Sequence, residues 1–91
     1  QQVDAEFFAS LIKKNANGWN LVWRAIKAVD LDKNGFLQID ELESCFRDIF
    51  PYDLNGKSSV HYFRQFGTDH DKSLVNYRKI KEDILRRVKI L

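Results

Sequence analysis

Oxygen-bearing side chains alternate along one short stretch, where Asp30, Asp32 and Asn34 are followed by Gly35 and then by Glu41. A hard divalent cation such as calcium takes roughly six to eight oxygen ligands. Short carboxylates and amides at alternate positions can supply them from a chain that curls round the ion. Glycine allows the sharp turn, because it adopts backbone angles at which a Cβ atom would clash. Residues 30–41 therefore predict a cation-binding loop.

This stretch resembles the twelve-residue calcium loop of the EF-hand family, with glycine at its sixth position and glutamate at its twelfth. The resemblance implies a site for one calcium ion. The implied ligands are the side chains of Asp30, Asp32, Asn34 and Glu41 and the main-chain carbonyl of Phe36. Gln38, at the ninth position, would act through a water molecule. A charged surface turn is the alternative, since Asp, Asn and Gly are common in ordinary turns.

Apolar residues repeat at helical spacing on both sides of the loop, which predicts amphipathic helices over 19–29 and 41–50. They are Val22, Ile26 and Val29 before the loop, and Leu42, Cys45, Phe46 and Ile49 after it. Pro51 is expected to end the second helix. Cys45 lies on the apolar stripe, so we interpret it as a packed residue.

A single helix–loop–helix leaves an apolar face uncovered, so a second unit is expected to bury it. We expect that unit over 58–91: Ser58 or Ser59 caps a helix bearing Val60, Phe63 and Phe66, and a final helix runs over 77–91. Val75 is expected to pair with Leu37 in a short two-stranded ladder. The predicted fold is all-α, a paired EF-hand with this ladder, plus an N-terminal helix.

The second loop has suitable residue types without a suitable register. Counting back from Val75 places Thr68, His70 and Lys72 at the first, third and fifth positions. Counting forward from Phe66 places Gly67, Asp69 and Asp71 there instead. Either way a cation, Lys79 or Arg78, stands where the closing glutamate belongs, and it would repel calcium. We expect a degenerate loop that keeps the fold without the metal.

An N-terminal helix is predicted over 3–14, within a segment 1–17 that precedes the paired unit 18–91 (calcium-binding half 18–50, degenerate half 58–91). Residues 15–18 are expected to break this helix. It resembles the outgoing helix of a preceding EF-hand; alternatively, it packs on the domain as a lid. The chain has no methionine, so we expect it to be a piece of a longer protein.

Whole-chain composition restricts the cellular compartment and the kinds of binding partner. A single cysteine excludes an internal disulfide and indicates a reducing compartment, so we expect an intracellular protein, cytoplasmic or cytoskeletal. Charge is uneven: residues 1–50 carry 6 basic and 8 acidic side chains, and residues 51–91 carry 9 and 5. The basic half is either a solvated face or a surface for an acidic partner or anionic lipid. The small net charge does not favour nucleic-acid binding.

Two functional hypotheses follow. The first is a calcium-binding regulatory lobe with affinity of about micromolar, which presents a helix-binding surface to a protein partner. The second is a calcium-independent adaptor, similar to a myosin light chain, that grips a partner helix. The absence of methionine favours the adaptor over a promiscuous sensor. Trp19 and Trp23 are interpreted as core residues, or alternatively as the lining of that groove. The sequence shows no nucleophile-and-base pair, so we expect no enzymatic activity in this chain, although a longer parent protein could be an enzyme.

Overall fold

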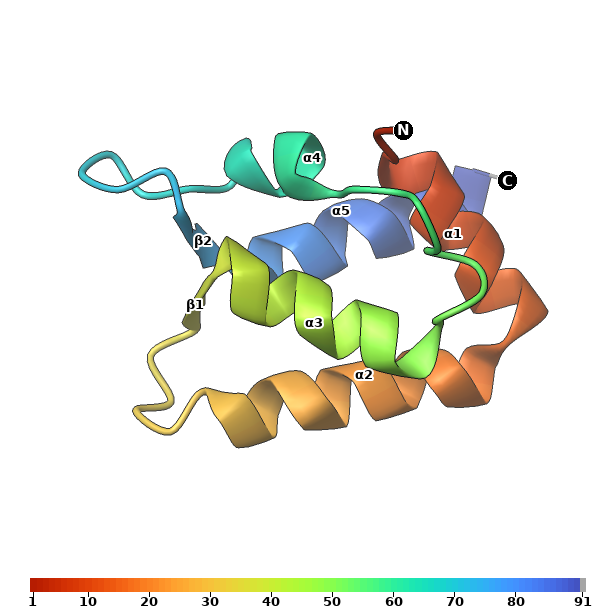
Figure 1. Cartoon of the computed structure of the whole chain (residues 1–91), viewed down its shortest axis with the longest axis horizontal. Helices are drawn as coiled ribbons and strands as arrows, with labels where there is room; N and C mark the ends of the chain where they lie inside the picture. Colours follow the sequence, from red (N-terminus) through yellow and green to blue (C-terminus); the bar gives the residue numbers. More distant parts are fainter. Residues whose placement is uncertain (91) are drawn as a thin grey trace.

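The computed structural model describes residues 1–90, which form five helices and one two-stranded antiparallel sheet (Figure 1). In chain order they are α1 (Ala5–Lys14), α2 (Ala16–Val29), β1 (Phe36–Gln38), α3 (Ile39–Ile49), α4 (Val60–Arg64), β2 (Leu74–Asn76) and α5 (Tyr77–Ile90). The mostly helical class with one small sheet agrees with the predicted layout. No helix in residues 1–90 has the length and apolar character needed to cross a membrane.

The two strands join the loops at one end of the molecule, on the left in Figure 1. Leu37 lies opposite Val75 in the register, as the sequence predicts, and both side chains are buried. Each strand leads directly into a helix, α3 after β1 and α5 after β2. The strand pair therefore sets the relative position of the two loops.

The helices enclose one hydrophobic cluster, with Phe8, Phe46 and Phe63 completely buried at its centre. Trp19 and Trp23 are only 4% and 5% exposed and pack edge to face. Their interpretation as core residues is confirmed, because neither tryptophan lies open for a partner helix. Cys45 is also buried and has a free thiol, as expected for a packing residue.

The first helix packs into this core through an aromatic side chain. The ring of Phe8 lies 4.9 Å from that of Phe46, 5.8 Å from that of Phe63 and 6.1 Å from that of Tyr62, measured between centroids. Burying so large an aromatic ring is a main source of stability in a chain of this size. Helix α1 thus packs on the domain; whether it is also the outgoing helix of a preceding EF-hand stays a prediction.

Two helix boundaries near the N-terminus differ from the prediction. Helix α1 begins at Ala5, because Asp4 caps it by accepting a hydrogen bond from the amide of Phe7. Val3 precedes the helix, and its amide donates to the carbonyl of Ser58. Helix α2 begins at Ala16, so the chain breaks only at Asn15, and the expected division between residues 17 and 18 lies inside α2.

The expected incoming helix of the second unit is reduced to the five residues of α4, so Phe66 lies beyond its end. The amides of Gln65, Phe66 and Gly67 each donate to the carbonyl three residues earlier, which tightens the chain into turns. Ser59 occupies the N-cap position, but its hydroxyl donates to the Glu43 carboxylate at 2.9 Å. A side chain from α3 therefore anchors this end of α4.

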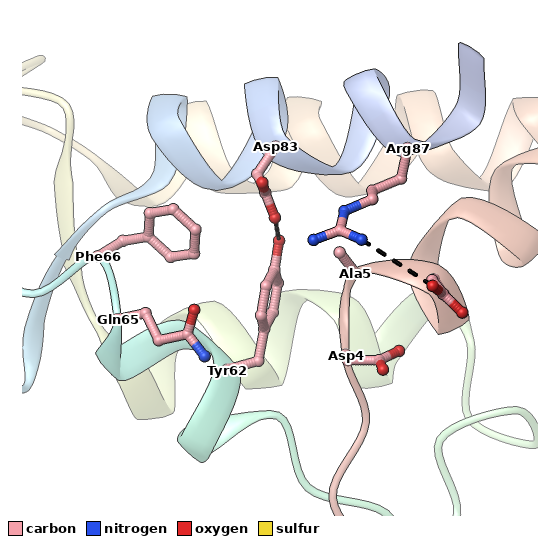
Figure 2. Close-up of a pocket in the computed structure, with 8 residues that line it drawn as sticks. Asp4, Ala5, Tyr62, Gln65, Phe66, Asp83 and Arg87 are labelled. Atoms are coloured by element: carbon pink, nitrogen blue, oxygen red, sulfur yellow. Dashed lines mark hydrogen bonds and ion pairs between the residues drawn. The ribbon is translucent and has the colours of Figure 1, made fainter. Parts of the chain in front are cut away.

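Helix α4 is held to its neighbours around a small hollow, shown in Figure 2. The hydroxyl of Tyr62 donates to Asp83 on α5 at 2.6 Å. Arg87, also on α5, forms an ion pair with Glu6 on α1 at 3.9 Å. Burial and the neighbouring carboxylate raise the pKa of the Tyr62 phenol, so the proton stays on the tyrosine. These contacts fasten α1 and α4 against the last helix.

Candidate metal site

Asp30 anchors the predicted loop at the end of α2, where its side chain is only 3% exposed. One carboxylate oxygen, Oδ2, accepts hydrogen bonds from the amide of Gly35 at 2.9 Å and from the hydroxyl of Tyr77 at 2.6 Å. The other, Oδ1, accepts a longer bond of 3.3 Å from the amide of Asn34. A buried carboxylate needs such donors, because losing its hydration is costly. The loop is thus wound round a fixed anion.

The same contacts keep Asp30 charged. The hydrogen bond from Tyr77 lowers the pKa of the Asp30 carboxyl, and the amides of Gly35 and Asn34 and the charge of Lys33 act in the same direction. Burial acts in the opposite direction and raises this pKa, but the net result is a lowered pKa. The pKa of the Tyr77 phenol is raised, by burial first and then by Asp30. At neutral pH the proton therefore stays on Tyr77 and the negative charge on Asp30.

The turn itself depends on backbone angles that most residues avoid. Gly35 has φ of +85°, and Lys33, two residues earlier, has φ of +56°. A Cβ atom at residue 35 would also lie 3.4 Å from the guanidinium of Arg78. The positive φ is the reason that glycine fits the sixth position, since contact with the flexible end of Arg78 would be ordinary van der Waals contact. The side-chain oxygen of Asn34 accepts a hydrogen bond from the amide of Phe36 at 3.0 Å, which holds the loop as it enters β1.

Glu41, predicted to close the loop, lies exposed in the first turn of α3. Its Oε1 accepts a hydrogen bond of 3.2 Å from the amide of Gln38, just before the helix. A carboxylate is favoured there, because the first amides of a helix lack partners within it. The carboxylate is therefore held at the start of α3.

One hollow of about 330 Å³ is lined by all five predicted ligands, which are Asp30, Asp32, Asn34, Phe36 and Glu41, and by Gln38. The available donors are carboxylate, amide and carbonyl oxygens, the set that a hard cation prefers. They do not converge on one point: within residues 1–90, no three His, Cys, Asp or Glu side chains gather as a metal cluster. The residue types fit calcium, and Glu41 is one side chain that must turn.

The second loop matches the first in its strand and in its exit into a helix, but its approach is longer: residues 65–73 separate α4 from β2, whereas residues 30–35 separate α2 from β1. Val75 stands opposite Leu37, and α5 begins two residues after Val75, as α3 begins two residues after Leu37. The strand pairing places Lys79, not Arg78, at the position equivalent to Glu41; which residue begins the second loop stays a prediction, because its approach to the strand is longer than in the first loop.

Side chains in the second loop bond to their own turn. The hydroxyl of Thr68 accepts from the amide of Asp71 at 3.0 Å and donates to its carbonyl at 2.8 Å. The carboxylate of Asp71 accepts from the amide of Ser73 at 3.0 Å and from its hydroxyl. These hydrogen bonds lower the pKa of the Asp71 carboxyl. Asp69 and His70 are exposed and form no cluster with Asp71 within residues 1–90.

Tyr77 is the residue of this site that the sequence did not reveal. Its spacing places it on the apolar stripe of the last helix, and its side chain is indeed buried. The hydroxyl nevertheless reaches Asp30, which lies 47 residues earlier in the chain. No local pattern could have identified this contact, because it depends on how the two loops pack together.

No protein-family model, curated protein or solved structure matches this chain. The likeness of residues 30–41 to an EF-hand loop is thus carried by their types, their spacing and their position in the fold.

Proposed function

We propose that this chain is a calcium-binding regulatory lobe of the EF-hand type, which takes up one calcium ion and responds by moving α3. The observation that carries the proposal is the single hollow lined by every predicted ligand, with the charged carboxylate of Asp30 fixed in its wall. When bound, calcium supplies a divalent charge at which the three ligand carboxylates can meet.

The ligand side chains have different parts in this process. Gly35 and Tyr77 donate hydrogen bonds to Oδ2 of Asp30, whereas Oδ1 accepts only one long hydrogen bond and is therefore the oxygen available to the ion. Asp32 is exposed and adjusts at little cost. Glu41 has to exchange its hydrogen bond with Gln38 for the ion. It is the ligand whose movement has consequences beyond the loop.

Glu41 lies in the first turn of α3, so drawing its carboxylate inward moves the start of that helix. Helix α3 also carries Phe46, whose ring lies 5.8 Å from that of Trp19 and 5.7 Å from that of Trp23. A shift of α3 must repack these rings, because a dense core does not deform continuously. The tryptophans are therefore built-in reporters of the change.

The adaptor hypothesis is less well supported. It places a partner helix against Trp19 and Trp23, but both are buried and Phe8 of α1 already packs on Phe46. A partner helix would have to displace α1 to reach this core. A regulatory lobe needs no such displacement before calcium binds.

Calorimetric titration with calcium, with tryptophan emission read in parallel, tests the proposal. We expect one ion at an affinity of about micromolar, with altered emission and loss of both signals in Glu41→Gln. Asp69→Asn is the matched control, since it removes an exposed carboxylate from the second loop. Absence of binding at about 1 mM calcium, the weak end of such sites, would refute the calcium proposal. Binding with unchanged emission would refute the movement of α3.

A further inference from the structure

A second hollow, of about 610 Å³, lies between α2 and α5 beside the loop of residues 30–41. Its apolar lining includes the rings of Trp23 and Tyr77 and the side chain of Leu85. The volume falls within the range of known ligand pockets, roughly 300–1,000 Å³. Apolar side chains are the usual lining of such pockets, whereas this one also has charged residues at its edge.

The rim of this hollow is strongly positive. Four cations surround it, and the single carboxylate among the lining residues is Glu82. The cations are Lys27 and Lys33 on one side and Arg78 and Lys81 on the other. Within residues 1–90 none of the four forms an ion pair. Four clustered cations outnumber the one carboxylate of the lining, and such an excess attracts an anionic group, most strongly where apolar walls limit screening.

Trp23 adds a specific unmet requirement. Its side chain lines the hollow, and its indole Nε1 is buried without a hydrogen-bond acceptor. Among the described residues it is the only buried side-chain nitrogen or oxygen in that condition. Lys81 lies over the same ring, with Nζ 5.5 Å from its centroid. Buried donors normally have a partner, so this indole N–H stands out among the described residues, and its ring lines the hollow.

We propose that this hollow, the α2–α5 pocket, binds an acidic peptide segment of a protein partner that carries a large apolar side chain. The apolar side chain packs on Leu85 beside the buried ring of Trp23, and the flanking carboxylates meet Arg78, Lys81 and the lysines opposite. This gives a chemical class to the partner of the proposed regulatory lobe. The negative charge of this partner segment complements the positive charge of the rim.

The pocket and the calcium loop share residues. Tyr77 lines the pocket while its hydroxyl holds Asp30, and Lys33 belongs to both. Arg78 packs beside Gly35 at the turn of the loop. A divalent cation in the loop adds positive charge beside the rim, so calcium and the acidic segment each favour binding of the other. This coupling rests on the proposed function, whereas the pocket does not.

Fluorescence anisotropy with a labelled octapeptide, two central leucines flanked by three glutamates on each side, tests the pocket in the presence of a calcium chelator. We expect the double variant Arg78→Glu/Lys81→Glu to weaken binding at least about tenfold. Lys79→Glu/Lys89→Glu is the matched control, since it makes the same charge change on α5 outside the pocket, and should show only a small loss. The neutral pair Arg78→Gln/Lys81→Gln separates loss of charge from any disturbance of the fold.

Two further readouts distinguish a pocket from general attraction. The indole N–H resonance of Trp23, assigned with Trp19→Phe, should shift when the peptide binds. A peptide with serines in place of the leucines should bind at least about fivefold more weakly if the apolar lining is used. Equal binding of both peptides, or binding that survives the double reversal, would overturn the proposal.

Repeating the titration with calcium tests the coupling, with at least about threefold tighter peptide binding expected. Peptide binding without a calcium effect supports the pocket and refutes the coupling. Absence of peptide binding at about 1 mM, a bound too weak for specific recognition, overturns the pocket even if calorimetry shows a calcium ion. Retention on phosphatidylserine vesicles through Arg78 and Lys81, without peptide binding, would also overturn it and assign the surface to a membrane.

Discussion

The two loops of this chain share the strand pairing and the exit into a helix, and they differ in the approach to the strand and in their side chains. In the first, buried Asp30 gathers the amides of Asn34 and Gly35, and Glu41 lies at the start of the following helix. In the second, Thr68 and Asp71 bond within their own turn. A lysine, Lys79, stands at the place that corresponds to Glu41. Side chains of both loops accept hydrogen bonds from amides of their own loop, so the loops differ in the burial of Asp30 and in the charge at the closing position.

This difference shows that the pairing of the loops and the candidate metal chemistry are specified separately. The pairing is held by the buried pair Leu37 and Val75 and by main-chain bonds between the units. The amide of Ile39 donates to the carbonyl of Ser73 at 2.8 Å, and the amide of Tyr77 donates to that of Gly35 at 3.3 Å. None of these contacts needs a charged side chain. A loop can therefore lose its ligands and still pair with its neighbour.

Replacing Glu41 with lysine, the residue type at the equivalent position of the second loop, should have the largest effect on calcium binding. Glu41→Lys places a positive charge at the hollow, so we expect calcium affinity to fall by more than about a hundredfold. The fold should persist, because this side chain is exposed. Calorimetry measures the affinity, and circular dichroism checks the helices. Retained micromolar binding would mean that Glu41 is not a ligand.

The reverse exchange should create a second, weaker site. The rebuilt second loop carries Thr68→Asp, His70→Asp, Lys72→Asn, Ser73→Gly and Lys79→Glu. We expect the calorimetric stoichiometry to rise from one ion to two, because the strand pairing and the exit helix already match those of the first loop. The control is the same variant with Lys79 retained, which should bind one ion. A rebuilt loop that still binds nothing would show that more than these side chains separates the loops.

Removing the hydroxyl of Tyr77, which links the two units, should have an intermediate effect on calcium binding. Tyr77→Phe takes one donor from Asp30 and leaves the amide of Gly35 in place. We expect about tenfold weaker calcium binding, as for other residues that orient a ligand. The calcium-free protein should lose about 1–2 kcal/mol of stability in urea unfolding. Tyr52→Phe is the matched control, because that residue is 92% exposed; equal effects from both would contradict the positioning role.

The smallest difference between the two loops should be in how the stability of the protein depends on pH. The pKa of Asp30 is lowered in the folded protein, chiefly by Tyr77. Its contribution to stability is therefore present above the unfolded pKa of about 3.9 and is lost as pH falls through the lower folded value. In calcium-free protein, Asp30→Asn should make stability fall less steeply below pH about 4. Asp71→Asn should change this slope little, since Asp71 is exposed and screened. Urea midpoints across this pH range measure both, and identical slopes would remove the contrast.

Local patterns in the sequence predicted much of the frame. Helical spacing of apolar residues located α2, α3 and α5, and Pro51 follows the end of α3 as expected. The ladder pair Leu37–Val75 could be predicted because the spacing of two similar units places equivalent residues together. The candidate ligands could be named from type and spacing alone, since each belongs to one continuous loop.

The sequence by itself determined helices α2, α3 and α5 and the residue types of the two loops. Only the tertiary structure decided that Tyr77 holds Asp30, that Phe8 fills the core and that a basic hollow opens between α2 and α5. Strand pairing likewise decided that Lys79, not Arg78, is equivalent to Glu41. The physical reason is range: helical periodicity and turn residues act within a few positions, whereas these contacts join residues that only packing brings together.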